Sequence, residues 1–119
     1  MPFELADPAG AVETNGAETV PLLTIPVPEG ATLRLIVAIT ATNGADDVFG
    51  ATLDALVYRL GAADVTLVNQ ALDPKWGAND GSNYQAEAVV AGPDIRIDVT
   101  GVVGQVVRWT PDGHGALVR

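Results

Sequence analysis

Cysteine is absent from this 119-residue chain, and histidine and serine each occur only once. Without cysteine the chain can form no disulfide, thiolate metal site or thiol nucleophile. A serine–histidine–aspartate triad would have to combine Ser82 with His114, but these lie in separate turn-like stretches and no nucleophile-elbow pattern surrounds Ser82. The carboxylates that could form a hydrolytic pair fall in turns or on solvated strand faces. We therefore expect no catalytic residues and no enzyme activity.

Basic residues are also scarce, with 6 Lys and Arg against 15 Asp and Glu, and the formal net charge is −9. Binding to the phosphates of nucleic acids or to an anionic membrane needs a basic surface, so we expect neither as a partner. The longest apolar run, residues 33–41, is too short to span a bilayer. The first ten residues lack the basic and apolar regions of a secretory signal. The sequence predicts a soluble protein without a targeting segment.

Aromatic residues make up only 5% of the sequence, whereas hydrophobic residues as a whole make up 48%. Most of these are valine, alanine, leucine and isoleucine, which suits thin β-sheets packed by branched side chains. The length suits one domain.

The longest predicted strand is Ala31–Thr42, in which Leu33 and every second residue after it form an apolar face. The opposite face is apolar only in its middle, which predicts partial cover by a second layer or by a partner. Residues Val48–Leu60 fit either a strand or a helix, and their β-branched and aromatic residues favour a strand.

The most regular pattern lies between Ile95 and Thr110. Ile95–Thr100 and Gln105–Thr110 both alternate apolar and polar residues, and two glycines lie in the link between them. The short link predicts a tight antiparallel pair at the centre of the sheet. Trp109 is predicted to lie in the core.

Three further features are predicted from local chemistry. Thr19–Pro28 contains three prolines and is predicted to be an edge strand or an outer strap, because proline removes a ladder donor. Residues 111–115 are predicted to form a final turn. Arg96 and Asp98 face the same side and are predicted to form a surface ion pair.

The stretch from Leu72 to Asn83 is predicted to be the one long irregular loop. Its Asp, Asn and Ser oxygens suit a hard cation such as Ca²⁺, although the spacing is not that of an EF-hand and the same residues beside glycine are ordinary turn formers. Trp76 is either an exposed platform for a sugar or protein partner, or a cap that folds back on one end of the domain. The residues that we single out as ligand or partner contacts are Asp73, Trp76, Asn79, Asp80 and Tyr84.

These patterns together predict an all-β fold. We expect a single β-sandwich or jelly-roll-like domain of about seven to eight short antiparallel strands over residues 20–119, since turn residues recur at near-regular spacing. Residues 1–19 have no periodicity and are predicted to be an extended N-terminal arm. Whether this arm packs on its own domain or on a neighbouring subunit is left open.

Two motifs in the second half carry a family resemblance. Residues 99–109 read VTGVVGQVVRW, a strand followed by a V-T-G-x-x-G turn and a strand that ends in Arg-Trp. Residues 55–60 and 64–68 read ALVYRL and DVTLV, as a preceding hairpin. Residues 53–109 thereby resemble a module of bacteriophage virion structural proteins, found in capsid-associated and in tail or fibre components. Residues 1–50 are not matched, and the chain continues beyond the motif. The resemblance implies a β-sandwich with a structural role and no catalytic residues.

The resulting hypothesis is a non-enzymatic phage structural protein that decorates or cements the outer capsid surface as a homo-oligomer, such as a trimer. Its expected partners are the major capsid protein or other virion proteins, and its expected location is the virion, assembled in the host cytoplasm. One alternative is an adaptor associated with the tail or fibres. Another is a carbohydrate-binding module that uses Trp76 and Tyr84 as stacking residues. No cofactor is expected beyond the Ca²⁺ considered for residues 73–83.

Overall fold

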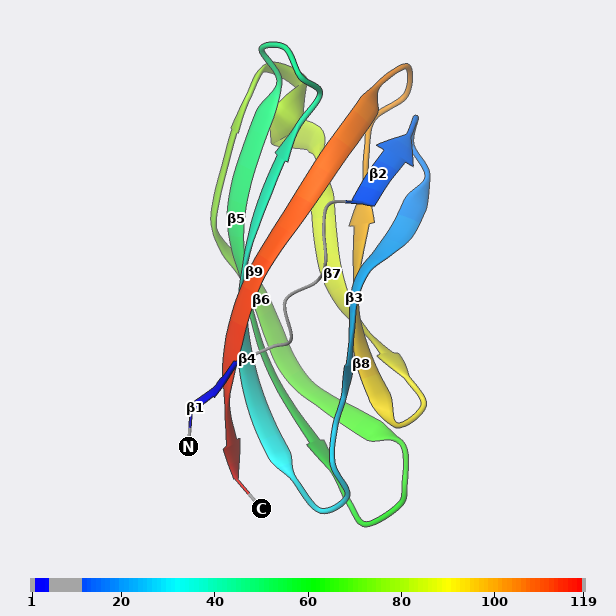
Figure 1. Ribbon diagram of the computed structural model, residues 1–119, viewed down its shortest axis with the longest axis vertical. Helices are drawn as coiled ribbons and strands as arrows, with labels where there is room; N and C mark the ends of the chain where they lie inside the picture. The colour runs from blue at the N-terminus through cyan, green and yellow to red at the C-terminus, as the bar shows by residue number, and fades with distance from the viewer. Residues whose placement is uncertain (1, 5–11, 119) are drawn as a thin grey trace.

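The computed structural model describes the backbone of residues 2–4 and all of residues 12–118, which form a two-layer antiparallel β-sandwich (Figure 1). The larger sheet has six strands, in the order β1-β9-β4-β5-β6 with β2 also paired to β9, and the smaller has three, in the order β3-β8-β7. The predicted all-β sandwich is confirmed. The strands are β1 Pro2–Glu4, β2 Val12–Asn15, β3 Thr19–Pro26, β4 Thr32–Thr42, β5 Val48–Arg59, β6 Val65–Ala78, β7 Gln85–Ala91, β8 Asp94–Thr100 and β9 Val106–Val118, with a 3-10 helix η1 at Asn79–Asn83.

The topology joins the two ends of the chain. β2 pairs with β9 in the larger sheet, and β3 pairs with β8 in the smaller one, so early and late strands are nested as in the outer strands of a jelly roll. β4, β5 and β6 instead follow one another as neighbours in one sheet. In the described part of the chain, no helix is long and apolar enough to cross a membrane.

The core lies between the two sheets, where the alternation of each strand buries one face. On β4 the side chains of Leu33, Leu35, Val37 and Ile39 are completely or almost completely buried, and each contributes about 1.5–3 kcal/mol relative to exposure. At one end of the core the rings of Phe49, Tyr84 and Trp109 pack with centroids 5.5–6.0 Å apart. The prediction of a strand over Val48–Leu60 is also confirmed, since β5 covers nearly all of it.

The predicted pairing of Ile95–Thr100 with Gln105–Thr110 is wrong. The first stretch is β8, at the centre of the smaller sheet, and the second begins β9 in the larger sheet. The link between them crosses from one layer to the other. At Gly101 a Cβ would lie 2.5 Å from the Thr14 hydroxyl oxygen, so this glycine permits a close crossing rather than a hairpin turn. Both strands face the same core, so their alternation could not reveal that they belong to different sheets.

Two predicted irregular segments belong to strands. Residues 72–78 continue β6, paired with β5 as far as Ala78 opposite Val48, so only residues 79–83 leave the strand. The predicted turn at residues 111–115 lies within β9, which pairs with β4 from Arg108 to Val118. Pro111 is tolerated because it falls in the part of β9 that neither β1 nor β2 pairs with. Long-range pairing has overridden the local turn signals in both segments.

β3 is an edge strand of the smaller sheet, as the prolines of Thr19–Pro28 predicted. Of the predicted arm, residues 1–19, the described parts lie on the chain's own domain, because β1 and β2 both pair with β9. Residues 1 and 5–11 of this arm lie outside the described residues.

Candidate interaction surface

The outer side of the larger sheet is formed by more strands than that of the smaller sheet. We call "outer face" the outward-pointing side chains of β4, β5, β6 and β9, which are the even-numbered positions of β4, β5 and β9 with their cross-strand partners on β6. Of the nine large apolar side chains exposed among the described residues, five lie here. These five are Val48, Leu56, Trp76, Val106 and Val118. Val48 and Trp76 lie near each other at one end of the sheet, and the other three lie at separate positions along β5 and β9. Exposed apolar side chains on a surface can contribute to a protein-interaction site.

Trp76 is the largest exposed apolar side chain on this face. It lies on β6 opposite Gly50, and its side chain is 70% exposed. A Cβ on Gly50 would have no neighbour within 4 Å, so the space above that glycine is open. The two interpretations of Trp76 were a platform and a cap over one end of the domain. The exposed position on the sheet agrees with a platform and not with a cap.

The charges on the outer face nearly balance. Arg34 of β4 donates two hydrogen bonds to the carboxylate of Asp54 on β5, at 2.7 and 3.1 Å. The hydrogen bonds from this guanidinium hold the pKa of Asp54 below its ordinary value. The other outward charges on β4, β5 and β9 are Arg108 and Asp112, and His114 also faces outward. Two arginines and two aspartates therefore point outward from β4, β5 and β9, and Glu13 of β2 lies opposite Arg108 on the same side of the sheet.

The sheet edge formed by β6 is blocked against strand addition. The pairing of β6 with β5 is interrupted by two register shifts, and Pro74 lies at one of them. Gln70 extends from β6 to the neighbouring edge of the smaller sheet, where its amide accepts from the N–H of Ala88 at 2.8 Å and donates to its carbonyl at 3.0 Å. The Gln70 side chain thus occupies the position that a peptide group of a strand beside β7 would take. It also links the edges of the two sheets. Bulges, prolines and capped backbone groups all discourage pairing with another strand.

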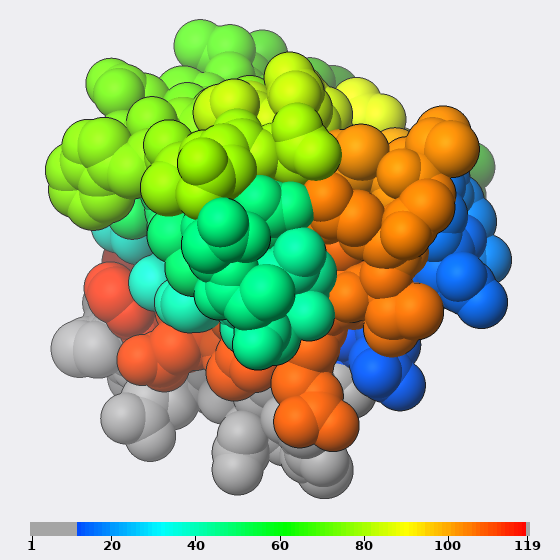
Figure 2. Space-filling view, turned by 90° about the horizontal axis from the view of Figure 1, so that it is seen from above, coloured from blue at the N-terminus to red at the C-terminus, as the bar shows by residue number. Residues whose placement is uncertain are grey.

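At one end of the sandwich, three segments that are distant in the sequence lie side by side (Figure 2), and a polar network joins them. The hydroxyl of Tyr84 donates to the Gln105 side-chain oxygen at 2.7 Å, and the Gln105 amide donates to Asp47 at 2.5 Å and to Asp80 at 3.2 Å. Burial, followed by the negative charges of Asp47 and Asp80, raises the pKa of Tyr84. Three loops that are distant in the sequence are joined here.

The same end also fixes η1 against the last residues of β6. A Cβ at Gly77 would lie 2.6 Å from the Ser82 backbone, and a Cβ at Gly81 would overlap the backbone of Val48. Only glycine allows these close approaches. Trp76 therefore projects from a segment that is held on both sides.

The structure brings together only some of the predicted site residues. Asp80 and Tyr84 meet through Gln105, and the Asn79 amide donates to the carbonyl of Asp46 at 2.6 Å. Asp73 is exposed on β6 and Trp76 lies on the outer face. The Tyr84 ring is completely buried, so it cannot form an aromatic pair with Trp76 for stacking on a sugar.

The hydrogen bonds of residues 79–82 hold η1 and the neighbouring loop in place. The N–H of Asp80 donates to the Asp47 carboxylate at 3.3 Å, and the hydroxyl of Ser82 donates to the Asn79 carbonyl at 2.9 Å. Across residues 2–4 and 12–118, no three His, Asp or Glu side chains gather where they could hold a metal ion. Sequence reasoning missed Asp47 and Gln105 as members of this network. No linear pattern marks them, because they are 58 residues apart.

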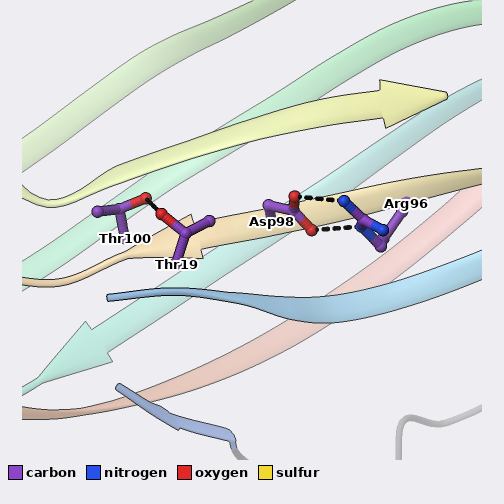
Figure 3. A network of polar contacts seen from close by, with 4 residues as sticks. All are labelled: Thr19, Arg96, Asp98 and Thr100. Carbon is purple, nitrogen blue, oxygen red and sulfur yellow. Dashed lines mark hydrogen bonds and ion pairs between the residues drawn. The ribbon is translucent and has the colours of Figure 1, made fainter. Parts of the chain in front are cut away.

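The outer face of the smaller sheet is more polar (Figure 3). Arg96 donates two hydrogen bonds to Asp98, at 2.7 and 2.9 Å, which confirms the predicted ion pair. The hydroxyls of Thr19 and Thr100 are 2.8 Å apart. Asp98 is only 8% exposed and borders an open hollow of about 380 Å³. The hollow is lined by Gln85, Ala86, Glu87, Asp98 and Thr100.

The charges on the outer face of the smaller sheet do not balance. Glu87 lies directly opposite Asp98, and Asp94 is on the same side of β8, so Arg96 faces three carboxylates. The hollow therefore has polar walls and an excess of negative charge, in contrast to the outer face of the larger sheet.

The fold and the two faces define the chain as a two-layer antiparallel β-sandwich whose larger sheet has an outer face that combines polar side chains with five of the nine large exposed apolar side chains of the described residues. Comparison with protein-family models gave no match. Comparison with curated proteins gave no match either.

Proposed function

We propose that this protein is a non-enzymatic structural protein of a phage virion, which attaches to the outer capsid surface by protein–protein contact and stabilises it. The observation that carries the proposal is the outer face of the larger sheet, which carries five of the nine large apolar side chains exposed among the described residues. A surface of this kind favours association with another protein over binding of a small polar molecule. The assignment to a phage particle comes from the resemblance of residues 53–109.

The rigidity of the sandwich also supports a structural role. Gln70 connects the edges of the two sheets, and the network around Gln105 connects three loops at one end. A surface that is held in one shape loses little conformational entropy when it binds, so more of the contact energy appears as affinity. Blocked sheet edges would also keep many copies soluble before assembly.

The test is the composition of particles. Virions produced by cells that encode this chain would be purified on a density gradient, and the protein quantified by mass spectrometry against the major capsid protein. A fixed ratio, together with rebinding of the purified chain to particles stripped of it, is expected. A small acidic host protein serves as the contamination control. Absence of the chain from the particles would overturn the proposal.

Fractionation of the same particles into heads and tails tests the position within the virion. Recovery with the heads is expected, and recovery only with the tails would replace capsid decoration by a role as a tail or fibre adaptor. Glycan binding is not proposed as a second function, because burial of Tyr84 leaves Trp76 without its expected aromatic partner.

A further inference from the structure

The size of the outer face suits a specific protein interface. β4 has 11 residues and is paired along its length with both β5 and β9. At about 3.3 Å per residue and about 4.8 Å between strands, the surface of β9, β4, β5 and β6 measures about 36 by 19 Å, or about 700 Å². Specific interfaces bury about 600–1,000 Å² on each partner. The face is therefore large enough to hold one partner by itself.

The charge distribution indicates which partner fits. Two copies of a chain with net charge −9 repel one another, and the repulsion is smallest where opposite charges are matched. The outer face comes close to this condition, because Arg34 and Arg108 lie among Asp54 and Asp112 on β4, β5 and β9. Glu13 of β2 lies directly opposite Arg108 and adds a third carboxylate to this side of the sheet, and Asp73 is exposed at the β6 bulge. The outer face of the smaller sheet, with its carboxylate excess, does not meet the condition.

The edges of the sandwich disfavour the usual alternative, in which two copies continue one sheet. β9 is covered by β1 and β2, and β3 carries Pro21 and Pro26. β6 is interrupted by bulges, and β7 is capped by Gln70. These features disfavour strand addition at the described edges and favour contact between copies face to face.

We propose that the outer face of the larger sheet binds a second copy of this chain, so that two sandwiches pack with these sheets apposed. The inference rests on the proposed structural function and assigns the outer face to contact between copies, so that attachment of the assembly to the capsid would use another part of its surface. Two apposed sheets lie about 10 Å apart, which lets side chains such as Trp76 and Leu56 interdigitate with those of the partner copy.

Sedimentation velocity on the full chain over a wide range of concentration tests the inference. The unaltered protein is expected to associate, and Trp76→Asp and Leu56→Asp are each expected to weaken association about tenfold or more. Leu60→Asp and Val103→Asp are matched controls, because their side chains are 70% and 78% exposed but lie off the outer face, and they should change nothing. Far-UV circular dichroism establishes that each variant is folded.

Salt provides a second measurement. Association is expected to tighten as salt concentration rises, because salt screens the overall repulsion between two −9 chains while the interface itself is apolar. A monomeric unaltered protein at all concentrations, or equal association of the Trp76→Asp and Leu60→Asp variants, would overturn the inference. A monomer that is nevertheless present in virions overturns only the inference, whereas a dimer absent from virions overturns only the proposed function.

Discussion

Replacing Thr14 by valine removes one hydroxyl from the core at nearly constant side-chain volume. The indole N–H of Trp109 donates to this hydroxyl at 3.0 Å, and both side chains are completely buried. In Thr14→Val the indole N–H has no acceptor and no access to water. An unsatisfied buried donor costs about 1–3 kcal/mol, so we expect the free energy of unfolding to fall by that amount.

A double-mutant cycle separates the hydrogen bond from other effects of the substitution. Trp109→Phe removes the donor, so a further Thr14→Val change should then cost little, and the coupling energy should be about 1–3 kcal/mol. The assay is urea denaturation followed by far-UV circular dichroism, since Trp109→Phe removes the buried fluorophore. Thr14→Ser keeps the acceptor and loses one methyl group, which costs roughly 0.8 kcal/mol.

The refuting result is an equal cost of Thr14→Val in the unaltered and Trp109→Phe backgrounds. That result would mean that packing of the side chain, rather than the hydrogen bond, is what attaches β2 to the core. The hydrogen bond would then not explain why Thr14, Gly101 and Trp109 lie together at the crossing between the layers.

Three further predictions concern single contacts. Gly81→Ala should destabilise the fold by about 3 kcal/mol in urea denaturation, because its methyl group would overlap the β5 backbone. Gly50→Ala is the control and should be nearly neutral, because the space at its Cβ is open. Similar free energies of unfolding for the two variants would contradict this account. Arg34→Gln should raise the pKa of Asp54 in an NMR titration, because the hydrogen bond that lowers it is lost. The stability from this pair is present above the ordinary carboxyl pKa and is lost as pH falls through the lowered one; an unmoved titration would refute it. Gln70→Ala should cost about 1–2 kcal/mol and speed hydrogen exchange of the β7 amide that it caps, and unchanged exchange would show that the cap is dispensable.

A test of the N-terminal arm should respect the pairing of β2. Deleting residues 1–19 would also remove Thr14, and with it the acceptor of the Trp109 N–H. Deleting residues 1–11 keeps β2, so we expect that variant to remain folded by circular dichroism and the longer deletion to be strongly destabilised. Equal stability of the two deletions would argue against β2 as part of the domain.

The sequence alone was sufficient for several central strands and their buried faces. Alternation over Thr32–Thr42 predicted correctly which side chains fill the core, because a strand places successive residues on opposite faces. The same rule placed Trp109 inside and Arg108 outside. The prolines of β3 correctly predicted an edge, since proline cannot donate to a neighbouring strand.

Other local signals were misleading. Pro, Gly, Asn and Asp in residues 72–78 and 111–115 favour turns, yet both segments continue strands. In each case a long partner strand supplies continuous pairing, and its energy exceeds the local preference. Trp76 was singled out from the sequence, but its position on the outer face followed only once residues 72–78 were known to belong to β6.

What the sequence determined by itself was therefore the all-β class, the identity of the buried side chains and the shortage of catalytic groups. Only the tertiary structure decided which strands pair, that β8 and β9 lie in different sheets, and that Asp47, Asp80 and Gln105 meet at one end. The physical reason is that burial is a property of each residue in its own strand. Pairing and polar networks depend instead on residues far apart in the chain, and alternation looks the same whichever partner a strand has.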